Sequence, residues 1–156
     1  VSATDTSGIK TLVTMLGTTT IANNGTVDLF FLKLGQHTLI ASSTDNVGNS
    51  TSTSRDFRVV ATPESTLSDI DRAYSLGWVT KSVKNSLTKK LQASIKVSKV
   101  VERRVEGKPR AQKVQKVVDK ILAAAMLIEI QKLRGKGLNE QAYALFKEDI
   151  IWLIRN

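Results

Sequence analysis

Apolar and polar positions alternate in short segments through the first 60 residues. The pattern predicts β-strands at residues 1–4, 9–16, 26–32, 37–44 and 52–60. Runs rich in Asp, Asn, Ser and Gly separate these segments, and such residues favour turns. In the third strand Val27, Leu29 and Phe31 fall on one face. This part of the chain is therefore predicted to be an all-β module.

After Pro63 the spacing of apolar residues changes to the period of amphipathic helices. A first helix is predicted from a cap at Ser65 or Thr66 to a left-handed position at Gly77. Thr80 is predicted to cap a second helix. Because the connections are short, these helices should pack as antiparallel neighbours.

Two further helices complete the predicted antiparallel four-helix bundle. Pro109 fits the first turn of the third helix, Gly135 ends that helix, and Asn139 caps the fourth. The third helix has one long apolar face, which is predicted to point into the core. Its members are Val114, Val117, Val118, Ile121, Leu122, Ala125 and Ile128.

The charge is distributed unevenly and supports two domains. Residues 1–63 hold four bases and four acids, so their net charge is zero, whereas residues 64–156 carry the whole +9. We therefore predict one domain at residues 1–61 and another at residues 64–156. The longest apolar run, residues 121–130, is too short to span a bilayer.

Two motifs in the first domain resemble bacterial Ig-like domains. Residues 35–39 read Gly-Gln-His-Thr-Leu, residues 45–49 read Asp-Asn-Val-Gly-Asn, and residues 2–9 also fit these modules. Ig-like sandwiches contain about seven strands. The resemblance therefore implies an incomplete β-sandwich, truncated at its N-terminus, with at least one strand expected before Val1.

The second domain resembles the FIMAH domain, a helical module at the C-termini of secreted bacterial hydrolases and other extracellular proteins. The resemblance rests on Gly-Trp-Val-Thr at 77–80, the basic linker before Pro109, and the run at 139–154. It implies an accessory domain with no catalytic role of its own and an extracellular or cell-surface location. It also fits a parent protein that is a hydrolase or lyase acting on polysaccharide.

Few residues are suited to catalysis. His37 is the only histidine and there is no cysteine, which argues against a zinc cluster or a Ser-His-Asp triad. Glu148 and Asp149 are adjacent on a helix, so they point about 100° apart, and Glu129 reads as an exposed acid at the rim of its helix. No two carboxylates are predicted to face each other, and the chain is predicted not to be an enzyme.

No cofactor is predicted. Asp5 and Asp45 follow strand ends, where they could hold Ca²⁺ together with loop carbonyls. The favoured interpretation is that each carboxylate accepts hydrogen bonds from its own turn.

Basic residues gather around one end of the predicted bundle. The candidate anion-binding face consists of Lys113, Lys116, Lys120, Arg103, Arg104 and Arg110. A solvated surface, binding of an acidic polysaccharide or anionic cell-wall polymer, and binding of nucleic acid are all open. A solvated surface is the favoured interpretation, and nucleic acid is the least favoured, since no nucleic-acid recognition motif is present.

Trp78 and Trp152 are the two tryptophans. Either indole could stack on a sugar ring, although a place in the core is the favoured interpretation in a chain with so few aromatic residues.

The expected function is that of a non-catalytic C-terminal accessory region of a secreted or cell-surface protein. The Ig-like part would act as a spacer, and the helical part would bind polysaccharide or an anionic surface. The alternative is a structural subunit of an extracellular assembly, which would use the open sandwich edge for self-association or strand exchange.

Overall fold

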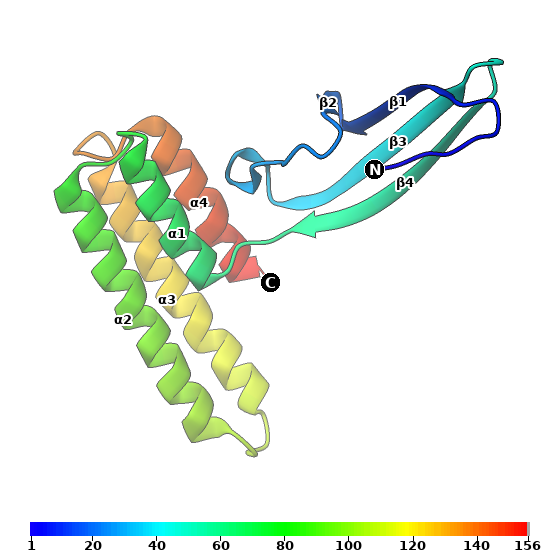
Figure 1. The fold of residues 1–156 in the computed structure, drawn as a ribbon. Coiled ribbons are helices and arrows are strands. Elements are labelled where there is room, and N and C mark those ends of the chain that lie inside the picture. Colours follow the sequence, from blue (N-terminus) through cyan, green and yellow to red (C-terminus); the bar gives the residue numbers. More distant parts are fainter. Residues whose placement is uncertain (156) are drawn as a thin grey trace. The chain divides into compact units, whose positions relative to one another are not determined.

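The computed structural model describes residues 1–155, which divide into two compact units (Figure 1). The first unit spans residues 1–60 and contains only strands and one short 3₁₀ helix. The second unit begins at Ala61 and contains four α-helices. The protein is thus a β unit followed by an α unit.

The first unit is a single antiparallel sheet with the strand order β2-β1-β3-β4. The strands are β1 (Ile9–Leu16), β2 (Thr19–Ile21), β3 (Gly35–Asp45) and β4 (Ser50–Val59). The predicted strands at 9–16, 37–44 and 52–60 are confirmed, and the three-residue β2 was not predicted.

Two predicted strands are wrong. Residues 1–4 form no strand, and residues 26–32 contain the 3₁₀ helix η1 (Leu29–Phe31). The cause is local: the Asp28 carboxylate accepts a hydrogen bond from the Phe30 N–H at 3.1 Å, which favours a turn over extended backbone. Leu29 and Phe31 are largely exposed, so their alternation does not mark a buried face.

The sheet also exposes apolar side chains. Met15 pairs with Ile40 across β1 and β3, and Val13 lies two residues from Met15 on the same face. All three side chains are exposed. Within residues 1–60 no second sheet covers them.

The second unit packs α1 (Pro63–Ser75), α2 (Lys81–Val105), α3 (Ala111–Leu133) and α4 (Glu140–Arg155) around one core. Helices α1 and α3 each contact both α2 and α4. The largest fully buried side chains come from all four helices and from the loop before α4; they are Phe146, Ile70, Leu87, Ile130 and Leu138.

The helix caps follow the predictions in part. Thr80 accepts from the Val83 N–H and Asn139 accepts from the Ala142 N–H, so both predicted caps are confirmed. The first helix begins earlier than predicted, because Thr62 and Ser65 form a reciprocal capping box with Pro63 at the first helical position.

The predicted start of the third helix at Pro109 is wrong. Pro109 lies in a turn, and Arg110 adopts a left-handed conformation with φ of 68° before α3 begins at Ala111. This positive φ belongs to the turn that reverses the chain between α2 and α3.

The predicted core face of α3 is also wrong. Its buried residues are Ala123, Met126 and Ile130, whereas Ile121 and Ile128 are 63% and 58% exposed. The helix is apolar on two opposite sides, since residues 121 and 128 lie about half a turn away from 123 and 130. The packing against α2 and α4 selects the side that carries the small Ala123.

Helices α2 and α3 are longer than their neighbours. They contain 25 and 23 residues, against 13 in α1 and 16 in α4. The additional length lies at their connection, where the two helices continue beyond the ends of α1 and α4 (Figure 1). We call residues 96–120 the hairpin tip.

Candidate functional site

The hairpin tip holds most of the excess positive charge. Residues 96–120 contain nine Lys or Arg and three Asp or Glu, a net charge of +6 out of +9 for the whole chain. The concentration arises because both ends of the α2–α3 connection are rich in bases. Arg103 and Arg104 occupy the last turn of α2, where positive charge also favours the helix dipole.

All six predicted basic residues lie on this tip. Five are exposed and Lys120 is half-buried. None of the six forms an ion pair with any residue in 1–155. Because no acid within residues 1–155 pairs with them, their charges are available to a partner. The residues are Lys113, Lys116, Lys120, Arg103, Arg104 and Arg110.

The structure brings Arg103 and Lys116 to one open groove of about 490 Å³ between the ends of α2 and α3. Glu102, Glu106 and Asp119 line the same groove. Its bases are thus balanced by acids, and the groove itself is not a concentrated anion site. The unbalanced charge lies on the outer surfaces of the two helices.

A polar cluster joins α2 to α3 at the base of the tip. The Ser98 hydroxyl donates to the Asp119 carboxylate at 2.6 Å, and the Gln115 amide donates to the same carboxylate oxygen at 3.0 Å. The Gln115 amide also lies 2.7 Å from the Ser98 hydroxyl oxygen. The three side chains are partly buried, and each is within hydrogen-bond distance of the other two.

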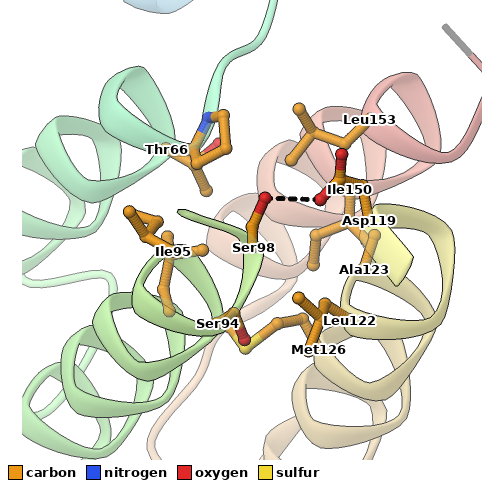
Figure 2. A pocket seen from close by; sticks show the side chains of 12 residues that line it. Thr66, Ser94, Ile95, Ser98, Asp119, Leu122, Ala123, Met126, Ile150 and Leu153 are labelled. Carbon is orange, nitrogen blue, oxygen red and sulfur yellow. Dashed lines mark hydrogen bonds between the residues drawn. The ribbon is translucent and has the colours of Figure 1, made fainter. Parts of the chain in front are cut away.

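Beside this cluster the four helices leave a pocket of about 220 Å³ (Figure 2). Leucine, isoleucine, methionine and alanine side chains make most of its wall, and polar groups from Thr66, Ser94, Ser98 and Asp119 interrupt it. Ser98 and Asp119 are both in the interior of long helices, where backbone N–H groups are engaged in helix hydrogen bonds. The pocket can hold a small apolar group, but its geometry provides no backbone donors for an oxyanion beside the serine.

The two tryptophans do not form one surface. Trp78 packs against the helical core, and its backbone carbonyl accepts from the Asn139 N–H at 3.0 Å, next to the start of α4. Trp152 is half-buried near the other end of α4. Thirteen residues of helix separate these places by about 20 Å. A single sugar ring cannot contact both indoles.

Two carboxyl groups do face each other, contrary to the prediction. The Asp69 carboxyl of α1 is a close neighbour of the Asp149 carboxyl of α4, and Asp149 is only 3% exposed. Burial, together with the neighbouring Asp69 carboxyl, raises the pKa of Asp149 to about 8, and burial raises the pKa of Asp69 as well. Such a contact holds a proton at neutral pH.

No sequence signal identified this pair. Asp69 and Asp149 lie 80 positions apart, and Asp149 was interpreted only through its neighbour Glu148. Glu129, which was read as an exposed rim acid, is mostly buried and pairs with Lys90 of α2 at 2.5 Å.

The acids of the β unit are engaged in their own turns. Asp5 accepts from the Ser7 N–H at 2.7 Å, and Asp45 accepts from the N–H groups of Val47 and Asn49 at 2.9 and 2.8 Å. Although desolvation opposes the shift, bonds from Asn49 and from nearby backbone N–H groups hold the pKa of Asp45 below its ordinary value. No group of three potential metal-ligating side chains is found within residues 1–155.

His37 lies in β3, where its ring stacks on Phe57 with the ring centres 5.5 Å apart. Its Nε2 is 2.7 Å from the Lys33 carbonyl oxygen. Both contacts fix the ring in the sheet.

Comparison with known proteins gives no relatives: no family model, no curated protein and no solved structure matches this chain. None of the helices described in residues 1–155 has the length and apolar character of a membrane-spanning segment.

Proposed function

We propose that this chain is a non-catalytic binding region of an extracellular or cell-surface protein, and that its helical unit binds a polyanionic partner. The observation that carries the proposal is the hairpin tip, with a net charge of +6 and six bases that form no ion pair with any residue in 1–155. Association with a polyanion releases its counterions, so many weak contacts sum to useful affinity.

Under this proposal the two units have different roles. The β unit is an Ig-like spacer, and its exposed Val13, Met15 and Ile40 correspond to the inner face of a sandwich whose second sheet is missing. The helical unit is a FIMAH-like four-helix bundle. The resemblance in sequence and the exposed sheet face support these assignments.

A binding role also fits the pocket better than catalysis does. The Ser98 hydroxyl donates to Asp119, whose carboxylate oxygen is shared with Gln115. Acyl transfer needs donors for the developing oxyanion as well as a base, and helix-interior backbone offers none at this position.

The test is binding of the full chain to heparin and to a neutral glucan at different salt concentrations. We expect heparin affinity to fall more than about tenfold between about 50 and about 200 mM salt, and no binding to the glucan. The variant Lys113→Glu/Lys116→Glu/Lys120→Glu, which lowers the net charge of the chain from +9 to +3, should lose the heparin signal.

A matched control applies the same change of charge away from the tip. Lys81→Glu/Lys89→Glu/Lys136→Glu also gives a net charge of +3 and should keep most of the heparin affinity. Equal losses in both variants would show that net charge alone attracts heparin. Binding only to the glucan would direct attention to Trp78 or Trp152 instead.

A second candidate is an assembly subunit, which one observation favours. Strand β2 pairs only with Thr14–Leu16 of β1, and β4 has a partner only on the β3 side, so two strand edges within residues 1–60 present unpaired backbone. Light scattering distinguishes the candidates. The binding-region proposal expects the mass of one chain at all concentrations, whereas assembly through strand edges expects a mass that rises with concentration.

A further inference from the structure

The outer side of the α2–α3 hairpin carries a row of exposed apolar residues along both helices. We call them the outer stripe; they are Val97, Val100, Val114, Val117, Ile121 and Ile128. Each is between 44% and 63% exposed, although amphipathic helices of a folded protein ordinarily turn such side chains to the core. The row occurs because α3 is apolar on the side opposite its core face.

Contacts between the helices place the two halves of the stripe side by side. Lys90 of α2 pairs with Glu129 of α3 on this side of the hairpin, at 2.5 Å. Val97 follows Lys90 by seven residues, which brings it to the same side of α2. On α3, Ala125 precedes Glu129 by four residues, and Ile121 lies one further turn along. The stripe is therefore two helices wide.

Basic residues border the stripe on both sides. Lys113 and Lys120 follow its α3 flank, Lys96 follows its α2 flank, and Arg104 continues the line of Val97 toward the end of α2. All four lack an ion pair within residues 1–155. The acid beside the stripe, Glu129, is neutralised by Lys90.

We propose that the outer stripe docks on the surface of a lipid bilayer with anionic headgroups. This inference rests on the proposed function, and it identifies the polyanionic partner as the anionic surface of a bilayer. The valine and isoleucine side chains enter the boundary between headgroups and acyl chains, while the lysine and arginine heads stay at the level of the phosphates. The helices lie in the plane of the bilayer and do not cross it.

The charges favour a bilayer over a second copy of the chain. Two copies joined by their stripes would bring the basic borders of both molecules together, and like charges at close range oppose association. An anionic bilayer neutralises both borders at once. A soluble polyanion would satisfy the bases but would leave the stripe in water.

The experiment uses the full chain and vesicles of phosphatidylcholine alone or mixed in equal parts with phosphatidylglycerol. We expect binding to the mixed vesicles and not to pure phosphatidylcholine. The variant Val114→Ser/Val117→Ser/Ile121→Ser should bind mixed vesicles at least about tenfold more weakly, because it loses apolar side chains that enter the bilayer. It should keep its heparin affinity, because its charge is unchanged.

A control variant, Val13→Ser/Met15→Ser/Ile40→Ser, removes exposed apolar side chains from the sheet and should leave vesicle binding intact. Since the chain has no cysteine, Val117→Cys can carry a polarity-sensitive dye. Its emission should shift to the blue on mixed vesicles, and a dye at Lys136→Cys should not respond.

The outcomes separate the two proposals. If the serine variant binds mixed vesicles as tightly as the wild type and the dye at position 117 stays in water, the stripe does not insert and the bilayer proposal is overturned, while heparin binding still supports the proposed function. A wild-type dimer that the serine variant converts to monomer would instead identify the stripe as a contact between copies. If the wild type binds neither heparin nor the mixed vesicles, both proposals are overturned.

Discussion

Replacing Ile130 with alanine is expected to destabilise the helical unit by about 2–5 kcal/mol, whereas Ile128→Ala should change its stability by less than about 0.5 kcal/mol. The two residues have the same side chain and lie on the same helix. Ile130 is 1% exposed and belongs to the shared core, and Ile128 faces away from it. Truncation at 130 removes buried methyl groups and leaves a cavity, while truncation at 128 removes a group that is already in water.

The measurement is urea unfolding of the full chain followed by far-ultraviolet circular dichroism, which reports mainly the helical unit. Ile128→Ala serves as the control for the change in helix propensity, which is a few tenths of a kcal/mol in favour of alanine. A larger loss at 128 than at 130 would mean that α3 packs by its other apolar face, and the outer stripe would then be core.

Asp149→Asn is expected to stabilise the helical unit at neutral pH by about 2 kcal/mol and to remove most of the loss of stability that the wild type shows as pH rises from about 4 to about 8. The amide has nearly the shape of the carboxyl group, cannot ionise, and can donate to Asp69. Within the wild type, Arg72 favours ionisation of Asp69, and Glu148 disfavours ionisation of Asp149. The substitution therefore replaces a buried acid by a neutral group with the same partner.

The sign of the pH dependence follows from the raised pKa of Asp149. Its pKa is about 8 in the fold and near the ordinary aspartate value of 3.8 in the unfolded chain. Between these values the folded state keeps a proton that the unfolded state releases, so stability is fully present below the lower value and is lost as pH rises toward 8. The steepest loss is about 1 kcal/mol per pH unit.

Unfolding in urea between about pH 5 and about pH 9 checks this expectation. The matched control is Asp71→Asn on the same helix as Asp69, since the Asp71 side chain is 64% exposed and pairs only at the surface with Lys84. That control should change the free energy of unfolding by no more than about 1 kcal/mol, and its stability should depend on pH as steeply as that of the wild type. A wild type that is equally stable across this range would contradict a protonated pair.

The strands that were predicted correctly are those in which alternation and turn residues agree. The error at residues 26–32 shows the limit of alternation, because one carboxylate, Asp28, bonds the Phe30 N–H and bends the backbone. That competition depends on a single side-chain hydrogen bond. The spacing of Val27, Leu29 and Phe31 is the same for a strand and for this exposed turn.

The face of α3 could not be chosen from its own sequence. Two apolar sides run along the helix, and the one with larger β-branched residues is the more hydrophobic at its N-terminal half. Close packing decides against it, since α2 and α4 approach the side with Ala123 and Met126. The Asp69–Asp149 contact could not be predicted for the same reason. It depends on how α1 packs against α4, and the spacing of residues within either helix does not indicate it.

The cluster of Ser98, Gln115 and Asp119 determines how α2 and α3 are aligned along their length. Apolar contacts between two long helices tolerate sliding, because one leucine or valine fits where another did. A slide of one turn, about 5.4 Å, would separate the Asp119 carboxylate from both of its donors and leave it partly buried without them. The cluster thus selects a single register for the hairpin, as a buried polar residue does in a coiled coil. That register determines which side chains of α2 and α3 lie next to each other on the tip.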